Sequence, residues 1–308
     1  MSNNSNKRIV FFDILRIFAI FLVVLGHLAQ ATGIPYLNKF YGIPNFYWVS
    51  IAGFGVTLFL IVSGSALAYN HSNTIPLNEI KRFFANRIIR IYPTYWISII
   101  TVVVISLMVI PGYIHKLSFI NLFLTFSGLY VYLNQWGGPI MAVSWFIGLI
   151  LSLYLIYPLL NYLFNKNAIF TLLLLLFISI VSRLICGQLQ SIGIGNRLID
   201  WVPLCRVFEF GFGMYLVKSG LYINTIDVGK NLEKYIILLS NLSFPVYLIH
   251  ASFFDGQIIN SINMEHSIIN VLVYTIIALI IITTLSFIIY TIDYYLQNIL
   301  RRKRLIKR

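Results

Sequence analysis

The chain has 308 residues, of which 59% are hydrophobic and only 10% are charged, and its mean hydropathy is +0.86. This composition is more apolar than a soluble core requires and is typical of a polytopic membrane protein. The formal net charge of +13 does not indicate a nucleic-acid ligand, because the basic residues lie mainly in short gaps between apolar runs and in the C-terminal tail, where they act as topology signals.

The first apolar run, residues 9–29, is long enough to cross a bilayer and carries Asp13, Arg16 and His27. Charges inside a membrane helix are costly and usually mark a functional path. The step from Arg16 to His27 turns the helix by about 1100° and rises about 16 Å, so both side chains lie on one face. Asp13 precedes Arg16 by three residues and can form an ion pair with it. The alternative, a cleaved signal peptide, conflicts with these charges.

We expect an all-α polytopic bundle of eight spans, with both termini cytoplasmic, forming a single domain over residues 1–308. The predicted spans cover residues 9–29, 46–70, 91–113, 141–163, 168–186, 197–217, 235–254 and 268–296. This topology places most lysines and arginines inside. If the apolar segment 118–133 also crossed, that bias would be reversed, so we expect this segment at the outer interface or as a re-entrant piece.

Basic and apolar residues alternate at helical spacing in KRFFANRIIRIYPTYW, residues 81–96. Pro93 is expected to end this helix, which would lie on the cytoplasmic surface. Arg87 and Arg90 then bind either anionic lipid or an anionic ligand, and the sequence leaves both alternatives open.

Two further features of the later spans are expected to be structural. Arg206 and Glu209 lie three residues apart within one span and are predicted to pair with each other. Cys186 and Cys205 lack metal-ligand spacing, so we expect neither a zinc site nor a disulfide framework.

Six segments together resemble the acyltransferase 3 family of integral-membrane acyltransferases. FFDILRIFAIFLVVLGHL matches the opening helix of that family, an arginine, ten residues and a histidine, through Arg16 and His27. The later segments, in chain order, are LFLIVSGSALA with Ser63, RIIRIYPTYW with Arg87 and Arg90, VSWFIGLILSLYLIYP with Trp145, RVFEFGFGMYL, and SFPVYLIH with Tyr247 and His250. The chain departs from the family pattern at Ile150, where many members have glutamate, and eight spans are fewer than is usual.

The resemblance implies that an acyl group, acetyl or succinyl, is transferred from cytoplasmic acyl-CoA to a hydroxyl of a cell-envelope or secreted glycan, as in O-acetylation of an exopolysaccharide. It implies no bound cofactor and no metal; acyl-CoA, above all acetyl-CoA, is the donor substrate. The acceptor would be a glycan or a lipid-linked sugar. Membrane lipid and proteins of glycan synthesis or export are the expected partners, and the cell membrane is the expected location.

Candidate roles follow from side-chain chemistry. Neutral imidazole can take the proton of an attacking hydroxyl, so His27 is the expected base. Arg16, with Asp13 as its counter-ion, would orient the donor, and Arg87 and Arg90 would bind the CoA phosphates. The remaining substrate-site candidates, which include the possible oxyanion donors, are Ser63, Trp145, Tyr247 and His250.

A glycan exporter or flippase is the alternative function, in which the charged face of residues 9–29 would line a conduit. Transporters often show inverted repeats or broken helices at matching positions of their halves, and the sequence shows neither. A non-catalytic membrane scaffold explains the charged face least well.

Overall fold

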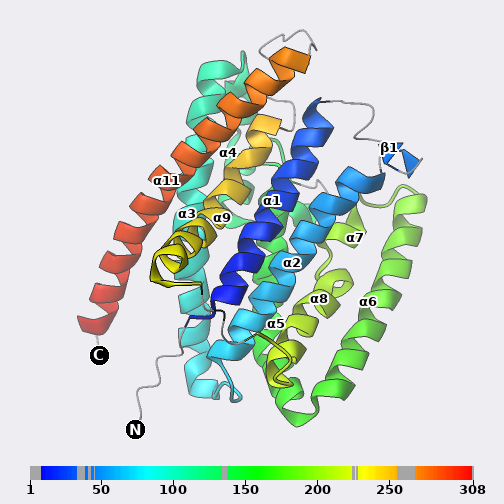
Figure 1. Ribbon diagram of the computed structural model, residues 1–308. Helices are drawn as coiled ribbons and strands as arrows, with labels where there is room; N and C mark the ends of the chain where they lie inside the picture. The colour runs from blue at the N-terminus through cyan, green and yellow to red at the C-terminus, as the bar shows by residue number, and fades with distance from the viewer. Residues whose placement is uncertain are drawn as a thin grey trace.

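The computed structural model is built almost entirely from helices (Figure 1) and describes residues 8–32, 39–40, 43–44, 46–133, 137–223, 226, 228–254 and 268–306. The long helices are α1 (Val10–Thr32), α2 (Phe46–Asn70), α3 (Ile80–Val109), α5 (Ser144–Lys166), α6 (Ala168–Ser191), α8 (Pro203–Lys218), α9 (Lys230–Phe254) and α11 (Ile268–Ile306). The short elements are β1 (Lys39–Phe40), β2 (Ile43–Pro44), α4 (Phe119–Ser127), α7 (Leu198–Trp201) and the 3-10 turns η1 (Leu77–Glu79), η2 (Tyr113–Lys116) and η3 (Tyr130–Leu133). β1 and β2 pair as an antiparallel two-stranded sheet.

Among the described residues, seven helices are long and apolar enough to cross a membrane, and the protein is a multi-pass membrane protein. The first turn of α1 and the last turn of α11 lie at the same end of the bundle, which we call the inner end (Figure 1). This placement requires an even number of passes, and we infer that the shorter α8, which is not one of these seven helices, supplies the additional one. The predicted fold class, a polytopic helical bundle, is confirmed.

The span predicted over residues 197–217 is interrupted. It consists of the four-residue α7 and the 16-residue α8. The break falls at Val202, which is extended (φ −65°, ψ 122°) because the following Pro203 disfavours helical geometry at that position. Pro203 then occupies the first helical position of α8, where its missing N–H costs nothing.

The prediction that Pro93 ends a surface helix is wrong. α3 runs through Pro93 as one helix of 30 residues, about 45 Å long, which exceeds the hydrocarbon thickness of about 30 Å. Membrane helices tolerate proline because neighbouring groups satisfy the freed carbonyl. Arg87 and Arg90 therefore lie on the inner part of a spanning helix.

The segment 118–133 does not cross the membrane, as expected. Its helix α4 has nine residues, about 14 Å. Three side chains near the middle of α3 donate hydrogen bonds to the last carbonyls of α4: Tyr92 to Ser127 O (2.9 Å), Tyr95 to Thr125 O (2.5 Å) and Trp96 to Phe126 O (2.9 Å). These bonds satisfy carbonyls that a helix end leaves open and hold α4 against α3.

Small residues bring α2 and α8 together at the centre of the bundle. A Cβ on Gly64 would lie 2.0 Å from Phe210 O, and a Cβ on Gly213 would lie 1.9 Å from Ile61 O. Ser65 also donates a 2.9 Å hydrogen bond to Gly213 O. Close backbone approach through small residues is the usual packing mode of membrane helices.

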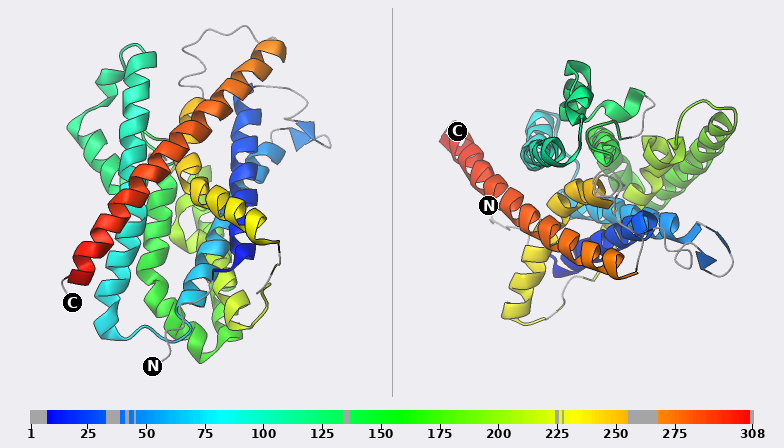
Figure 2. Two further views of the ribbon diagram at one scale, coloured as in Figure 1. Left: turned by 60° about the vertical axis from the view of Figure 1, so that its left-hand side comes forward. Right: turned by 90° about the horizontal axis from the view of Figure 1, so that it is seen from above.

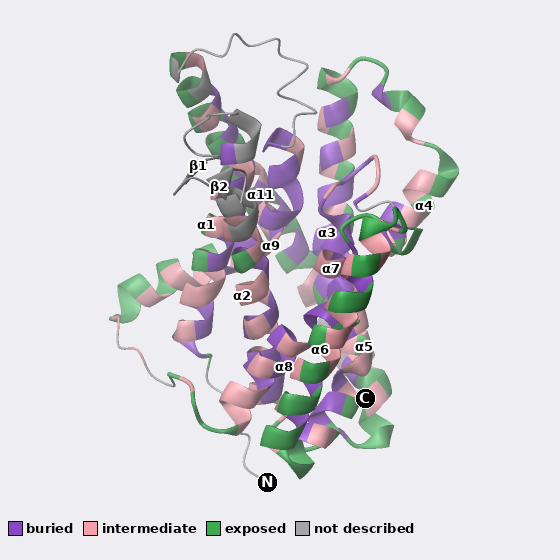
Figure 3. Ribbon diagram, turned by 90° about the vertical axis from the view of Figure 1, so that its right-hand side faces the viewer, coloured by how far each residue is buried: buried purple, intermediate pink, exposed green. Residues whose placement is uncertain are grey.

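The outer helices expose apolar side chains, as lipid contact requires. α6 packs mainly on α8, and α11 packs on α9 and α3 (Figures 1 and 2). Figure 3 shows exposed residues along α6 and buried residues in α8 behind it. The exposed side chains of α6 include Ile169, Phe170, Leu173, Phe177, Ile180 and Leu184.

α9 packs along α1 and carries a proline inside the helix, Pro245. The first half of α9 bends away from the second half (Figure 2), as expected when proline removes a backbone hydrogen bond. Ser240, before the bend, contacts Asp13 in the inner part of α1. His250, after the bend, contacts His27 in the outer part of α1.

Candidate active site

Asp13 has no exposed surface and is held by side chains from two helices and the preceding segment. Arg8 binds both carboxylate oxygens, at 2.6 Å through Nε and 2.7 Å through Nη2. Arg16 Nη1 donates to Oδ1 at 3.0 Å, which confirms the predicted ion pair. Ser240, on α9, donates a further bond of 2.6 Å to Oδ1. The carboxylate thus joins the inner ends of α1 and α9.

Three arginines from α1 and α3 converge near Tyr154 of α5. The guanidinium carbon of Arg87 lies 5.9 Å from the ring centroid of Tyr154 and 5.8 Å from that of Phe83. Arg16 lies within electrostatic range of both Arg90 and Tyr154. Among the described residues, Asp13 is the carboxylate that forms an ion pair with one of these arginines, Arg16. The group therefore has an excess of positive charge.

A histidine lines the inner end beside this group. The His71 ring lies 5.5 Å from Phe83 and 5.9 Å from Tyr157, centroid to centroid. Burial lowers the pKa of His71, and the positive charge of Arg87 adds to that effect. A lowered pKa keeps the imidazole neutral at neutral pH, so His71 adds an aromatic wall and no further charge.

At the other end of the face, His27 meets His250. Their ring centroids are 5.0 Å apart, with the rings at 66°. His250 is fully buried, and its Nδ1 lies 2.7 Å from the carbonyl oxygen of Tyr247. Because a carbonyl only accepts, Nδ1 carries the proton and Nε2 is left as the acceptor nitrogen of His250. His27 is only partly buried.

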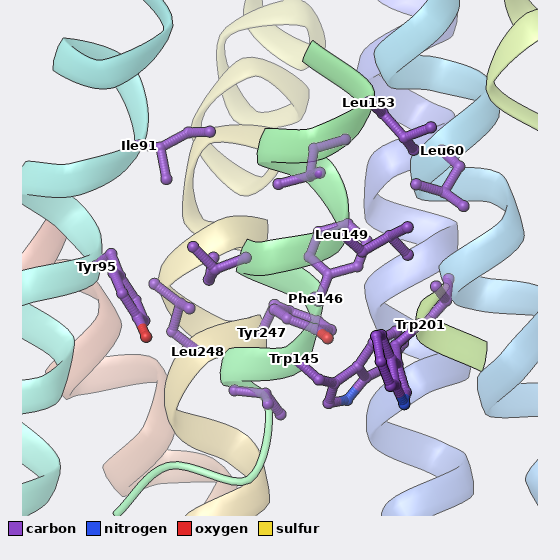
Figure 4. Packing of buried hydrophobic residues seen from close by; sticks show 14 of the residues in the cluster. Leu60, Ile91, Tyr95, Trp145, Phe146, Leu149, Leu153, Trp201, Tyr247 and Leu248 are labelled. Carbon is purple, nitrogen blue, oxygen red and sulfur yellow. The ribbon is translucent and has the colours of Figure 1, made fainter. Parts of the chain in front are cut away.

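Aromatic rings surround the outer histidine pair. The ring centroid of Tyr247 lies 5.7 Å from that of His250, 5.9 Å from that of Phe59 and 5.0 Å from that of Phe146. Trp145 lies 5.9 Å from Phe146, one ring further away from the histidines. Figure 4 shows Trp145, Phe146 and Tyr247 in the packed core. These rings give the buried side of the histidine pair an apolar environment, in which electrostatic interactions are stronger than in water.

Ser63 lies with the inner group. The preceding residue, Val62, packs against Ile9, just before α1, and Phe12, in its first turn. Ser63 is therefore about 20 Å along α1 from His27, given a rise of about 1.5 Å per residue, and is too far to stabilise an oxyanion beside that histidine. Tyr247 and Trp145 are the aromatic candidates for oxyanion donors that lie at the level of the histidine pair.

The predicted shared face of α1 is confirmed by its partners. Asp13 contacts Ser240 and His27 contacts His250, so both ends of the face point to α9. Arg16 and His27 are separated by about 16 Å along this face. The arrangement places a cationic group at one depth and an imidazole pair at another, along one helix pair.

The predicted Arg206–Glu209 pair is present at 3.5 Å, but Glu209 has a closer partner in Arg183 of α6, at 2.6 Å. Arg206 also donates to Thr57 of α2 at 3.0 Å. The three charged groups thus connect the short α8 to the helices on either side of it, which suits a structural role.

Several residues of the site were not found by sequence reasoning. From the sequence, Arg8 was interpreted only as a topology signal. A basic residue just before a helix that has an acid in its first turn is nevertheless a recognisable sign of an ion pair. Ser240 and Tyr154 have no local signal, because only the tertiary fold brings them to α1. Ile150 is buried in apolar surroundings, so that position supplies no carboxylate. No group of three metal-binding side chains occurs among the described residues.

A family model described as an acyltransferase domain, that of the acyltransferase 3 family, matches residues 9–225 of the chain. This match includes α1 to α8 and therefore both the arginine group and His27. No curated protein and no solved structure matches the chain.

Proposed function

Because the chain belongs to the acyltransferase 3 family and is a membrane acyltransferase, we propose that it transfers an acetyl or succinyl group from cytoplasmic acyl-CoA to a hydroxyl of a cell-envelope or secreted glycan. The proposed location is the cell membrane, with both termini and the start of α3 cytoplasmic. A lipid-linked sugar is an equivalent acceptor, and proteins of glycan synthesis or export are the proposed partners.

One observation carries the proposal: the face of α1 that holds Arg16 and His27 has a cationic group near its inner end and an imidazole pair nearer its outer end. Arg16, Arg87 and Arg90 converge near Tyr154 with more positive charge than Asp13 neutralises. Such an excess inside a membrane protein favours an anionic ligand. The phosphates of acyl-CoA are anions that guanidinium groups bind well.

The donor geometry follows from the helix. With its phosphates at the arginine group, acyl-CoA would extend its long pantetheine arm outward along the face of α1. The distance from Arg16 to His27 is about 16 Å. The thioester would thereby reach the histidine pair, where a glycan hydroxyl arrives from the outer side.

The proposed reaction needs a base, and we assign that role to His27. His27 takes the proton of the sugar hydroxyl as its oxygen attacks the thioester carbonyl, and the C–S bond breaks to release the CoA thiolate, which takes up the proton. The fixed tautomer of His250 presents Nε2 as an acceptor, so His250 serves as a positioning residue for His27. Tyr247 or Trp145 would donate to the developing oxyanion.

The test is an acyl analysis of envelope glycans from cells with the intact gene, a deletion, and a deletion complemented by the wild-type chain or His27→Ala. We expect acyl groups to disappear on deletion, to return with the wild type and to stay absent with His27→Ala, because a general base contributes about 10²–10⁴-fold in rate. The variant must insert and purify as monodisperse protein.

The exporter alternative predicts a different result. Glycan would accumulate inside the deletion strain while its degree of acylation stayed unchanged. That outcome, or near wild-type acylation by a well-folded His27→Ala chain, would overturn the proposed acyl transfer mechanism.

A further inference from the structure

The first half of α9, residues 230–239, lies outside the packed bundle. The buried residues of α9 begin at Ser240, and none of residues 230–239 is buried. In the left view of Figure 2 this half, drawn in yellow, runs across the bundle, and the view from above shows it projecting from one side. The second half runs along the bundle and brings His250 to His27, so it carries α9 to the outer level.

The projecting half has one apolar face and one basic face. Leu232, Tyr235 and Leu239 are spaced by three and four residues, so they share one stripe of the helix, and each exposes more than half of its surface. Lys230 and Lys234 are each two residues from Leu232, about 200° of helix rotation, and therefore lie on the opposite face. Both lysines are exposed. This half of α9 thus requires surroundings that are apolar on one side and aqueous on the other.

The end of the projecting half is held at the depth at which α1 begins. Ser240 Oγ donates to Asp13 Oδ1 at 2.6 Å, and Arg8 Nη2 donates to Asn241 Oδ1 at 3.1 Å. Arg8 lies just before α1, whose 23 residues rise about 35 Å and so span the hydrocarbon layer of about 30 Å. The start of α1 therefore lies at the boundary between hydrocarbon and headgroups, and the adjoining half of α9 lies at the same depth.

We propose that residues 230–239 form an interfacial helix that binds the phospholipid surface of the leaflet at the inner end. The stripe of Leu232, Tyr235 and Leu239 faces the acyl chains, and Lys230 and Lys234 face the headgroup phosphates. Tyrosine is enriched at this boundary because its ring is apolar and its hydroxyl is polar.

The depth and the two faces together favour lipid over a protein partner. A helix that runs across the bundle at the headgroup boundary meets acyl chains on one side and water on the other, as this sequence requires. The proposal concerns membrane contact alone and does not depend on the acyl-transfer proposal.

The test measures the surroundings of each face in the full chain, reconstituted in nanodiscs of phosphatidylcholine and phosphatidylglycerol. Cys186 and Cys205 are replaced by serine, and a spin label is attached to Tyr235→Cys or to its matched neighbour, Lys234→Cys. Collisions with oxygen, which concentrates among acyl chains, are compared with collisions with a water-soluble nickel chelate. We expect the ratio of oxygen to nickel collisions to be several-fold higher at position 235 than at position 234.

A scan along the helix separates an interfacial helix from a local effect of one label. Leu232→Cys and Leu239→Cys should behave as Tyr235→Cys does, and Lys230→Cys should behave as Lys234→Cys does, because the pattern follows the helical period. Equal access of the nickel chelate to both faces would place the helix in water. Shielding of the apolar stripe from both reagents would show that protein, such as a second copy of the chain, covers it. Either result would overturn the proposal.

Discussion

Asp13→Asn should destabilise the protein while leaving the side-chain volume nearly unchanged. The substitution removes the charge that Arg8 and Arg16 share, and both guanidinium groups lose an ionic partner. Leaving one partner of a buried ion pair uncompensated costs about 3–5 kcal/mol. Arg16 retains 22% side-chain exposure and can partly hydrate, so we expect about 2–3 kcal/mol.

The assay is thermal unfolding of purified protein in detergent, followed by size-exclusion chromatography. A loss of this size should lower the unfolding midpoint by about 3–5 °C. Arg8→Gln is the matched control: Arg8 is 42% exposed, and Asp13 would keep Arg16 and Ser240, so the loss should stay below about 1 kcal/mol. A midpoint for Asp13→Asn within a degree of wild type, or an equal loss for Arg8→Gln, would refute the reasoning.

Three further predictions concern the donor site, the helix packing and the topology. The double variant Arg87→Gln/Arg90→Gln should bind acetyl-CoA at least about 10-fold more weakly in equilibrium binding, because it loses charge-assisted phosphate contacts; unchanged binding would leave the two arginines as lipid contacts. Gly213→Ala should fail to purify as monodisperse protein, since its Cβ would lie 1.9 Å from a carbonyl oxygen of α2, whereas Gly53→Ala, which meets nothing within 4 Å, should behave as wild type. A cysteine placed at Lys81, in a chain with both native cysteines replaced, should react with an impermeant maleimide only after cells are permeabilised, and ready labelling of intact cells would reverse the orientation.

Much of α1 could be predicted from the sequence, because polar residues in an otherwise apolar membrane helix have few places to go. Helical geometry alone puts Asp13, Arg16 and His27 on one face, and the energetic cost of exposing them to lipid implies a partner helix. The structure supplies that partner as α9, with Ser240 at one end of the face and His250 at the other.

The breaks in the helices were harder to predict. Pro93 and Pro203 have the same local preference against helix in the preceding residue, yet α3 continues through the first and α8 begins at the second. The difference is tertiary: α3 is held on both sides of Pro93 by its neighbours, including α4, whereas the chain before Pro203 turns sharply into α7.

The contacts between distant segments could not be predicted from one sequence. Tyr154 gives no local sign that arginines from two other helices will surround it.

The short α8 has a consequence for the lipid around it. Its 16 residues rise about 24 Å, about 6 Å less than the hydrocarbon layer of an average bilayer. Immediately above it stands α7. Asp200 in α7 pairs with Arg197, the residue just before α7, and this exposed ion pair requires water or headgroups. A hydrophobic mismatch of this kind is relieved by local thinning of the bilayer. We therefore expect the headgroup layer to reach deeper over α8 than beside the 24-residue α6. The activity of the protein should then respond to the thickness of the bilayer.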